Sequence, residues 1–161
     1  MNQIVSAEVG IDYNTLLVQD AKVETSYPES GNLYYCFPGG VAFLTCMDCS
    51  HALVEAWQAD EIQIRPDTLR AIVVPIAVGR SGVVVNNVID PPDEGVYVPI
   101  PEGRYALVYE IKRRDDEDYF NSTEYQEDQE AGLQGVFCRL TFVPRESVEP
   151  QVLRNSNDPD F

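Results

Sequence analysis

The residues best suited to metal or redox chemistry lie in one short stretch of the chain. Cys46 and Cys49 have Cys-x-x-Cys spacing, and the single histidine, His51, follows two residues later. A structural zinc site closes four ligands around the ion, so Cys36 would have to reach this group from the preceding segment. A redox dithiol needs a helix N-terminus to lower its pKa, and here the pair follows an apolar run typical of a strand. We therefore expect ordinary reduced thiols, no metal and no cofactor, with a zinc site as the alternative.

Other catalytic chemistry has little support in the sequence. A single histidine weakens any triad of the serine or cysteine hydrolase kind. The glycines at 39–40 and in 79–82 lack the strand–loop–helix setting of a phosphate-binding loop. Carboxylates are abundant, but acid–base catalysis needs two of them in different environments across a cleft, and no pair stands out. We expect a protein that is not an enzyme and has no catalytic residues.

The bulk composition is dominated by negative charge. The 161 residues include 27 acidic and 11 basic side chains, a formal net charge of −16. Direct nucleic-acid binding is disfavoured, because it requires a basic face. A basic protein is a better partner, since opposite potentials speed the encounter. The alternative is acidity that serves only solubility.

The sequence also bears on location. It contains no apolar run long enough to cross a membrane. Its first residues lack the basic start and apolar block of a secretory signal. With thiols expected to be reduced, these features favour a cytoplasmic protein that does not bind membranes.

Extended runs of β-branched and aromatic residues predict the fold. Such residues pack well on a pleated sheet, and they fill most of 70–112. We expect a first strand from Val9 to Val18, a hairpin connection at 79–82, and a strand rather than a helix at 51–57. Pro75 lacks a backbone donor, so the strand that contains it should be an edge strand or carry a bulge. About eight or nine mostly antiparallel strands then form an all-β, single-domain β-sandwich over residues 1–161, with little helix.

One segment, 113–135, departs from this pattern. It carries eight acids and no base between 115 and 130. Like charges at this density favour an extended, solvated loop. Aromatic residues among carboxylates suit a protein interface, with rings as anchors and charges as steering groups. The expected partner-binding residues are Asp115, Asp116, Glu117, Asp118, Tyr119 and Phe120. The alternative is a solvated loop whose rings fold back on the sheet edge.

Several short motifs, in order along the chain, resemble the competence protein J (ComJ) family. They are Ile11-Asp12-Tyr13, Gly40-Val41-Ala42-Phe43, the run from Arg70 to Val78, Gly82-Val83-Val84-Val85, the run from Val98 to Leu107, and Leu140-Thr141-Phe142-Val143-Pro144. The resemblance covers most of residues 9–144. The acidic segment and residues 145–161 depart from the family pattern.

The resemblance implies a function that agrees with the charge. Members of this family inhibit, inside the cell, a competence-associated nuclease that acts in DNA entry. By this analogy the chain binds a basic nuclease groove and blocks it. The expected tail at 150–161 is flexible, and its last five residues, Asn157-Asp158-Pro159-Asp160-Phe161, are a second candidate for reaching an active site. An immunity protein against a toxin and an adaptor β-sandwich are the alternative functions.

Overall fold

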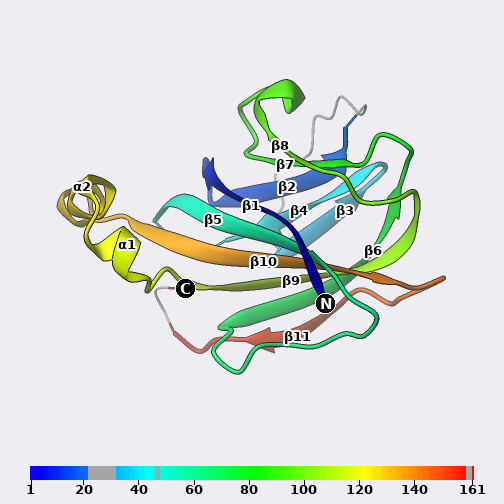
Figure 1. Cartoon of the computed structure of the whole chain (residues 1–161). Helices are drawn as coiled ribbons and strands as arrows, with labels where there is room; N and C mark the ends of the chain where they lie inside the picture. Colours follow the sequence, from blue (N-terminus) through cyan, green and yellow to red (C-terminus); the bar gives the residue numbers. More distant parts are fainter. Residues whose placement is uncertain (22–31, 46–47, 159–160) are drawn as a thin grey trace.

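Alternating apolar residues build two β-sheets that pack face to face (Figure 1). The computed structural model describes residues 1–21, 32–45, 48–158 and 161. Within these residues there are eleven strands: β1 (Asn2–Gly10), β2 (Thr15–Asp20), β3 (Tyr34–Phe37), β4 (Gly40–Leu44), β5 (Cys49–Gln58), β6 (Arg70–Val78), β7 (Val83–Asn86), β8 (Val96–Val98), β9 (Gly103–Arg113), β10 (Gln134–Pro144) and β11 (Gln151–Asn155).

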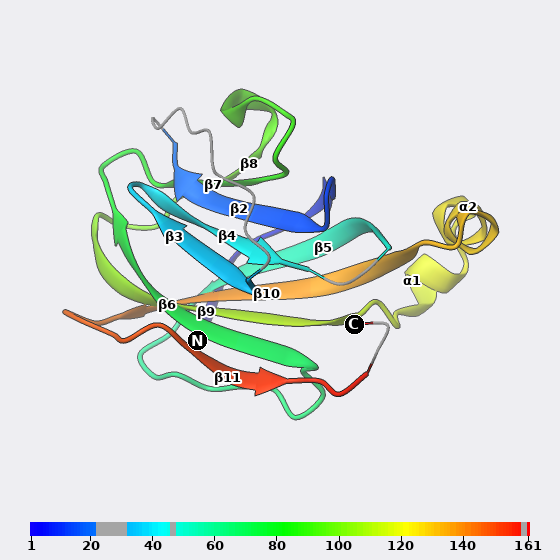
Figure 2. The same cartoon turned by 180° about the vertical axis from the view of Figure 1, so that it is seen from behind.

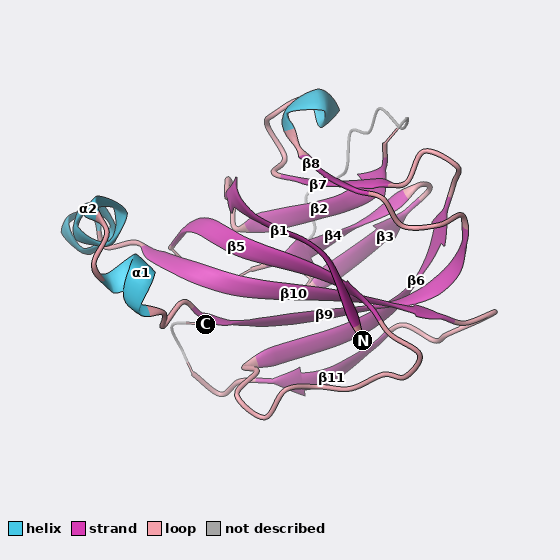
Figure 3. Ribbon diagram, viewed as in Figure 1, coloured by secondary structure: helices cyan, strands magenta, loops and turns pink. Residues whose placement is uncertain are grey.

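The larger sheet has six strands in the order β1–β5–β10–β9–β6–β11, and the smaller has five in the order β3–β4–β2–β7–β8. Every pair is antiparallel except β5 and β10, which run parallel. Between β9 and β10 the chain forms two helices, α1 (Glu117–Phe120) and α2 (Thr123–Ala131), and a short 3₁₀ turn (Pro92–Glu94) precedes β8 (Figure 3).

The core lies between the sheets. The ring of Phe43 in the smaller sheet stacks on the ring of Tyr109 in the larger one, with centroids 4.3 Å apart. In β6 every second residue, such as Ile72 and Val74, faces this core, as the period of a strand requires. The outer face of the larger sheet has its own apolar patch around Val73, which the segment after β10 covers.

The all-β sandwich expected from the sequence is confirmed, with eleven strands in place of eight or nine. The expected first strand, Val9 to Val18, is wrong. A two-residue turn at Tyr13 and Asn14 divides it into β1 and β2, which belong to different sheets. The sequence alone shows one apolar run, because both halves are buried in the same core.

Two local sequence signals, the glycines at 79–82 and Pro75, can be compared with the structure. The expected hairpin at 79–82 is wrong, because β6 and β7 lie in different sheets and this turn links the two layers. The strand that contains Pro75 is not an edge strand along its whole length, because β6 lies between β9 and β11. Pro75 itself is in the part of β6 with one neighbouring strand. It pairs with Ala106 of β9 on one side, while the register of β11 on the other side ends at Val73. Its missing donor therefore faces an open edge.

The acidic segment and the tail are more ordered than expected. Residues 113–135 form α1 and α2 rather than an extended loop. The tail, expected to be flexible, contributes β11, which pairs with β6. Backbone pairing with β6 holds residues 151–155 in a strand, although the polar sequence of the tail shows no strand pattern. Among the described helices, none is long and apolar enough to cross a membrane.

Candidate partner-binding surface

The acidic segment folds as a compact helical hairpin, residues 114–133, at one end of the sandwich (Figures 1 and 2). Asp116 caps α1 by accepting a hydrogen bond from the Tyr119 amide, and Ser122 caps α2 through the Tyr125 amide. At the other end of α2, Gly132 adopts a left-handed backbone, and the amides of Gly132 and Leu133 close a Schellman motif. These caps offset the repulsion between carboxylates that would otherwise favour an open loop.

An aromatic cluster holds the two helices together. The rings of Tyr119, Phe120 and Tyr125 have centroids 5.2 to 6.0 Å apart. The Tyr119 side chain is buried, with 3% of its surface exposed, whereas Phe120 is 45% exposed. Of the two rings expected to meet a partner, only Phe120 is therefore presented to solvent. Tyr119 lies beneath the surface and packs the hairpin against the sheet.

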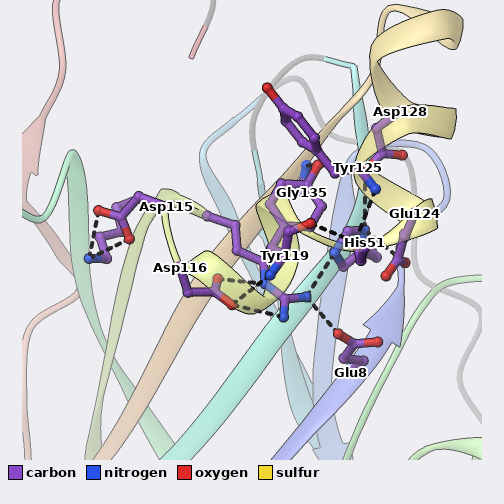
Figure 4. A network of polar contacts seen from close by, with 12 residues as sticks. Glu8, His51, Asp115, Asp116, Tyr119, Glu124, Tyr125, Asp128 and Gly135 are labelled. Atoms are coloured by element: carbon purple, nitrogen blue, oxygen red, sulfur yellow. Dashed lines mark hydrogen bonds and ion pairs between the residues drawn. The ribbon is translucent and has the colours of Figure 1, made fainter.

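A network of polar contacts joins the hairpin to β1 and β5 beneath it (Figure 4). The guanidinium of Arg114 donates to Glu8 at 2.6 Å and to Asp116 at 2.8 Å, and it lies over the ring of Tyr119. The hydrogen bonds from Arg114 lower the pKa of the Asp116 carboxyl below its ordinary value. One cation thus connects a strand, a helix cap and an aromatic ring.

His51, at the start of β5, is the centre of this network. Its Nε2 lies 3.1 Å from Nη1 of Arg114, and its Nδ1 lies 2.9 Å from the Ser50 hydroxyl and 3.3 Å from Glu124. The ring is 5% exposed and packs edge-on against Tyr119. We call Glu8, His51, Arg114, Tyr119 and Asp128 the anchoring network.

The hydroxyl of Tyr119 completes the anchoring network. It donates to the buried carboxylate of Asp128 at 2.6 Å and accepts from the Gly135 amide at 3.1 Å. Burial raises the pKa of the Tyr119 hydroxyl, and the neighbouring Asp128 raises it further. The hydroxyl therefore remains a neutral donor across the physiological range.

Glu8, His51 and Glu124 are the residues nearest to a metal-binding arrangement, with ligand atoms within 4.8 Å of one another. The guanidinium of Arg114 already bonds both Glu8 and His51. A divalent ion would have to displace this cation or share the space with it, at a large electrostatic cost. The three side chains are therefore better described as part of an ion-pair network.

Among the described residues, no cysteine belongs to a group like the zinc site considered as an alternative. Cys36 is exposed in β3, Cys49 is buried in β5, and Cys138 is buried in β10. Cys46 lies outside the described residues. Among the residues the structure describes, no potential metal-ligand group includes a cysteine.

The four carboxylates among the predicted binding residues fall into two groups, one with ion-pair partners and one without. Asp115 is exposed and pairs with Lys112, and Asp116 is held by Arg114. Glu117 and Asp118 are exposed, and neither has an ion-pair partner within the described part of the chain. The same holds for Glu127 on α2.

Glu130 is a second exposed α2 carboxylate of this kind. Glu127 and Glu130 belong to the acidic run but were not among the predicted binding residues. The sequence did not reveal them, because only the folded structure shows that they lie on a helix beside α1. The density of acids along the segment was the available signal.

The tail does not provide the free acidic end that the sequence suggested. Asp158 forms an ion pair with Arg113 at 2.7 Å, and the ring of Phe161 lies near the cations of Arg70 and Arg113. Residues 159 and 160 lie outside the described part of the chain. The described tail residues pack against the sandwich.

The family model for competence protein J (ComJ) matches residues 8–143, which include the helical hairpin, the smaller sheet and the larger sheet apart from β11 and most of β1. The chain belongs to the ComJ family. No curated protein matches it. The structure is similar to that of ComJ from Bacillus subtilis, described as the inhibitor of the DNA-degrading activity of NucA. The TM-score is 0.64 at 12% identity, covering 88% of this chain and 98% of that one.

A second solved structure, described as crocagin biosynthetic gene J, has a TM-score of 0.50 at 14% identity. The match covers 91% of this chain and all of the other. At such identities the structural matches establish the shared ComJ-like fold.

Proposed function

We propose that this ComJ-family protein is a non-enzymatic inhibitor that binds a nuclease and blocks its DNA-binding groove. The observation that carries the proposal is a set of four exposed carboxylates on one ordered hairpin, with no ion-pair partner among the described residues. They are Glu117, Asp118, Glu127 and Glu130.

The charge balance of the whole molecule supports this surface. Six basic side chains pair with carboxylates in the described structure: Arg65, Arg80, Lys112, Arg113, Arg114 and Arg139. The chain has 27 acids and 11 bases, so acids exceed bases by 16. A nuclease presents basic side chains that bind DNA phosphates. Carboxylates on the hairpin can pair with the same side chains and exclude the DNA.

The construction of the hairpin also supports the proposal. Both helices are capped, and the anchoring network attaches them to the larger sheet. A rigid surface loses little conformational entropy on binding. Phe120, with nearly half its surface exposed beside Asp118, supplies an apolar contact among the charges. Charges of this kind speed association, and a packed ring slows dissociation.

The experiment compares two variants with the same change in charge. The first carries Glu117→Gln, Asp118→Asn, Glu127→Gln and Glu130→Gln on the hairpin. The control carries Asp60→Asn, Glu61→Gln, Glu146→Gln and Glu149→Gln, four exposed acids near the far ends of β5 and β10. Each protein is titrated against the DNA-entry nuclease of its host, and DNA degradation and association rate are measured at several salt concentrations.

We expect the hairpin variant to associate with the nuclease about tenfold more slowly at low salt and to lose most of the salt dependence. The control should stay close to the wild type at every salt concentration. A wild-type protein that neither binds nor inhibits the nuclease would refute the function. Equal losses in the two variants would show that net charge, not the hairpin, governs the encounter.

A further inference from the structure

In the turn between β1 and β2, Tyr13 has a backbone conformation that tyrosine rarely adopts. Tyr13 and Asn14 both have left-handed backbones, with φ of 54° and 52°, between the bridged residues Asp12 and Thr15. This two-residue turn requires positive φ at both central positions, where glycine, asparagine and aspartate are favoured. Asn14 fits the requirement. A bulky tyrosine at such a position is an outlier, and its strain needs a compensating contact.

No such compensating contact is found among the residues that the structure describes. The Tyr13 side chain is 73% exposed, the highest value among the exposed large hydrophobic residues. Among the described residues its ring makes no aromatic contact and its hydroxyl no hydrogen bond. Fold stability alone therefore gives no reason for tyrosine rather than glycine or asparagine here.

The turn itself is firmly held. The Thr45 amide donates to the Asn14 carbonyl at 2.8 Å, and the Thr15 hydroxyl donates to the Tyr13 carbonyl at 2.9 Å. The Cys49 amide donates to the Asn14 side chain at 3.4 Å. These bonds fix the direction in which the ring leaves the backbone. A large ring on a fixed backbone can bind a partner with little loss of entropy.

The turn and the helical hairpin lie at the same end of the sandwich (Figures 1 and 2). Asp48, which precedes Cys49, also has a left-handed backbone, with φ of 56°, and its carbonyl accepts from the Gln134 amide where the hairpin rejoins β10. All non-glycine residues with positive φ in the described chain, Tyr13, Asn14 and Asp48, are therefore in this region. Asparagine and aspartate accept this backbone, so of the three only Tyr13 is strained, and strain of that kind gathers at binding sites.

We propose that Tyr13 is an aromatic anchor for the same nuclease, alongside the acidic hairpin; this inference rests on the proposed function. The ring can lie against an arginine or lysine of the DNA-binding groove through a cation–π contact, and the hydroxyl can accept a hydrogen bond from the same cation. The hairpin carboxylates then attract the groove, and Tyr13 and Phe120 hold it.

The test separates binding from folding. Tyr13→Asn removes the ring but keeps a residue that accepts a left-handed backbone, so the protein should fold at least as well as the wild type. Tyr97→Ala is the matched control, because Tyr97 is another exposed tyrosine, at 53%, on β8 of the smaller sheet. The affinity for the host nuclease, the thermal midpoint and the oligomeric state are measured for each protein.

We expect Tyr13→Asn to bind the nuclease about thirtyfold more weakly, mainly through faster dissociation. Its thermal midpoint should be unchanged or higher, and Tyr97→Ala should bind like the wild type. If the wild type binds and Tyr13→Asn binds equally well, the Tyr13 inference is wrong and the proposed function stands. An equal loss in Tyr97→Ala, or a changed oligomeric state in Tyr13→Asn, would also overturn it. If the wild type does not bind, both proposals fail.

Discussion

Nη1 of Arg114 lies 3.1 Å from Nε2 of His51, although the two residues are 63 positions apart in the sequence. Arginine is always charged and cannot accept a hydrogen bond, so it donates and Nε2 accepts. The proton of the neutral ring is then on Nδ1, where it faces the Ser50 hydroxyl and the Glu124 carboxylate. This contact orients the imidazole and fastens the helical hairpin to β5.

The attachment of the helical hairpin to β5 can be tested by filling the space around His51. A Cβ on Gly135 would lie 2.6 Å from Cε1 and 2.8 Å from Nε2 of the His51 ring. Gly135→Ala should push the ring away from Arg114 and destabilise the protein by about 1–3 kcal/mol. Hydrogen exchange should show faster opening of α1 and α2 than of β9. Gly10→Ala is the control, because a Cβ there meets nothing within 4 Å, and it should have little effect.

The charge and the capping role of Asp116 can be separated by two substitutions. Hydrogen bonds from Arg114 lower the pKa of this carboxyl below its ordinary value of 3.8. A lowered pKa in the folded state adds stability above pH 3.8, and this contribution is lost as the pH falls through the folded-state pKa. Asp116→Asn keeps the cap and should lose stability at neutral pH while flattening the pH dependence below 4. Asp116→Ala also removes the cap and should cost about 1 kcal/mol more. Urea unfolding between pH 2 and 7 measures both; an unaltered acid slope in Asp116→Asn would contradict the assignment.

The Tyr119 hydroxyl should contribute to stability through two buried hydrogen bonds. Tyr119→Phe leaves the Asp128 carboxylate without this donor and the Gly135 amide without its acceptor. The expected loss is about 1–3 kcal/mol in the free energy of unfolding. Tyr125→Phe, in the same cluster, removes a hydroxyl that has no hydrogen bond among the described residues and should be nearly neutral. Similar losses in both variants would show that the two hydrogen bonds of the Tyr119 hydroxyl are not the source of the loss.

A buried ion pair on the outer face of the larger sheet should stabilise the strands that carry the hairpin. Glu110 of β9 and Arg139 of β10 are directly opposite and joined at 2.6 Å, and both are buried. The same carboxylate accepts from the Arg65 amide and the Thr68 hydroxyl. Arg139→Met alone should cost about 3–5 kcal/mol, because it leaves a buried carboxylate without its cation. Adding Glu110→Leu should recover part of the loss, and a simple sum of the two single effects in a double-mutant cycle would argue against a coupled pair.

Much of the β-sheet architecture could be predicted because it depends on local patterns. Alternating β-branched residues bury one face whichever strand lies beside them, so the extended runs within 70–112 were recognisable as strands. Pro75 could be linked to an edge strand or a bulge because a missing donor has the same consequence in any sheet. Net charge is a sum over residues, and it pointed to a basic partner without any knowledge of the fold.

Only the tertiary structure decided which acids are free and which are held. The acidic segment looked extended because like charges repel locally, but caps at Asp116 and Ser122, together with a buried Tyr119, favour helices there. Asp116 meets Arg114, while Glu117 beside it faces solvent. Likewise, the sequence pattern predicts an ordinary strand residue at Tyr13, and only the structure shows its left-handed backbone and exposed ring. The sequence determines how much charge and apolar surface the chain has; long-range packing determines where they face, because contacts such as that between Arg114 and His51 leave no local pattern.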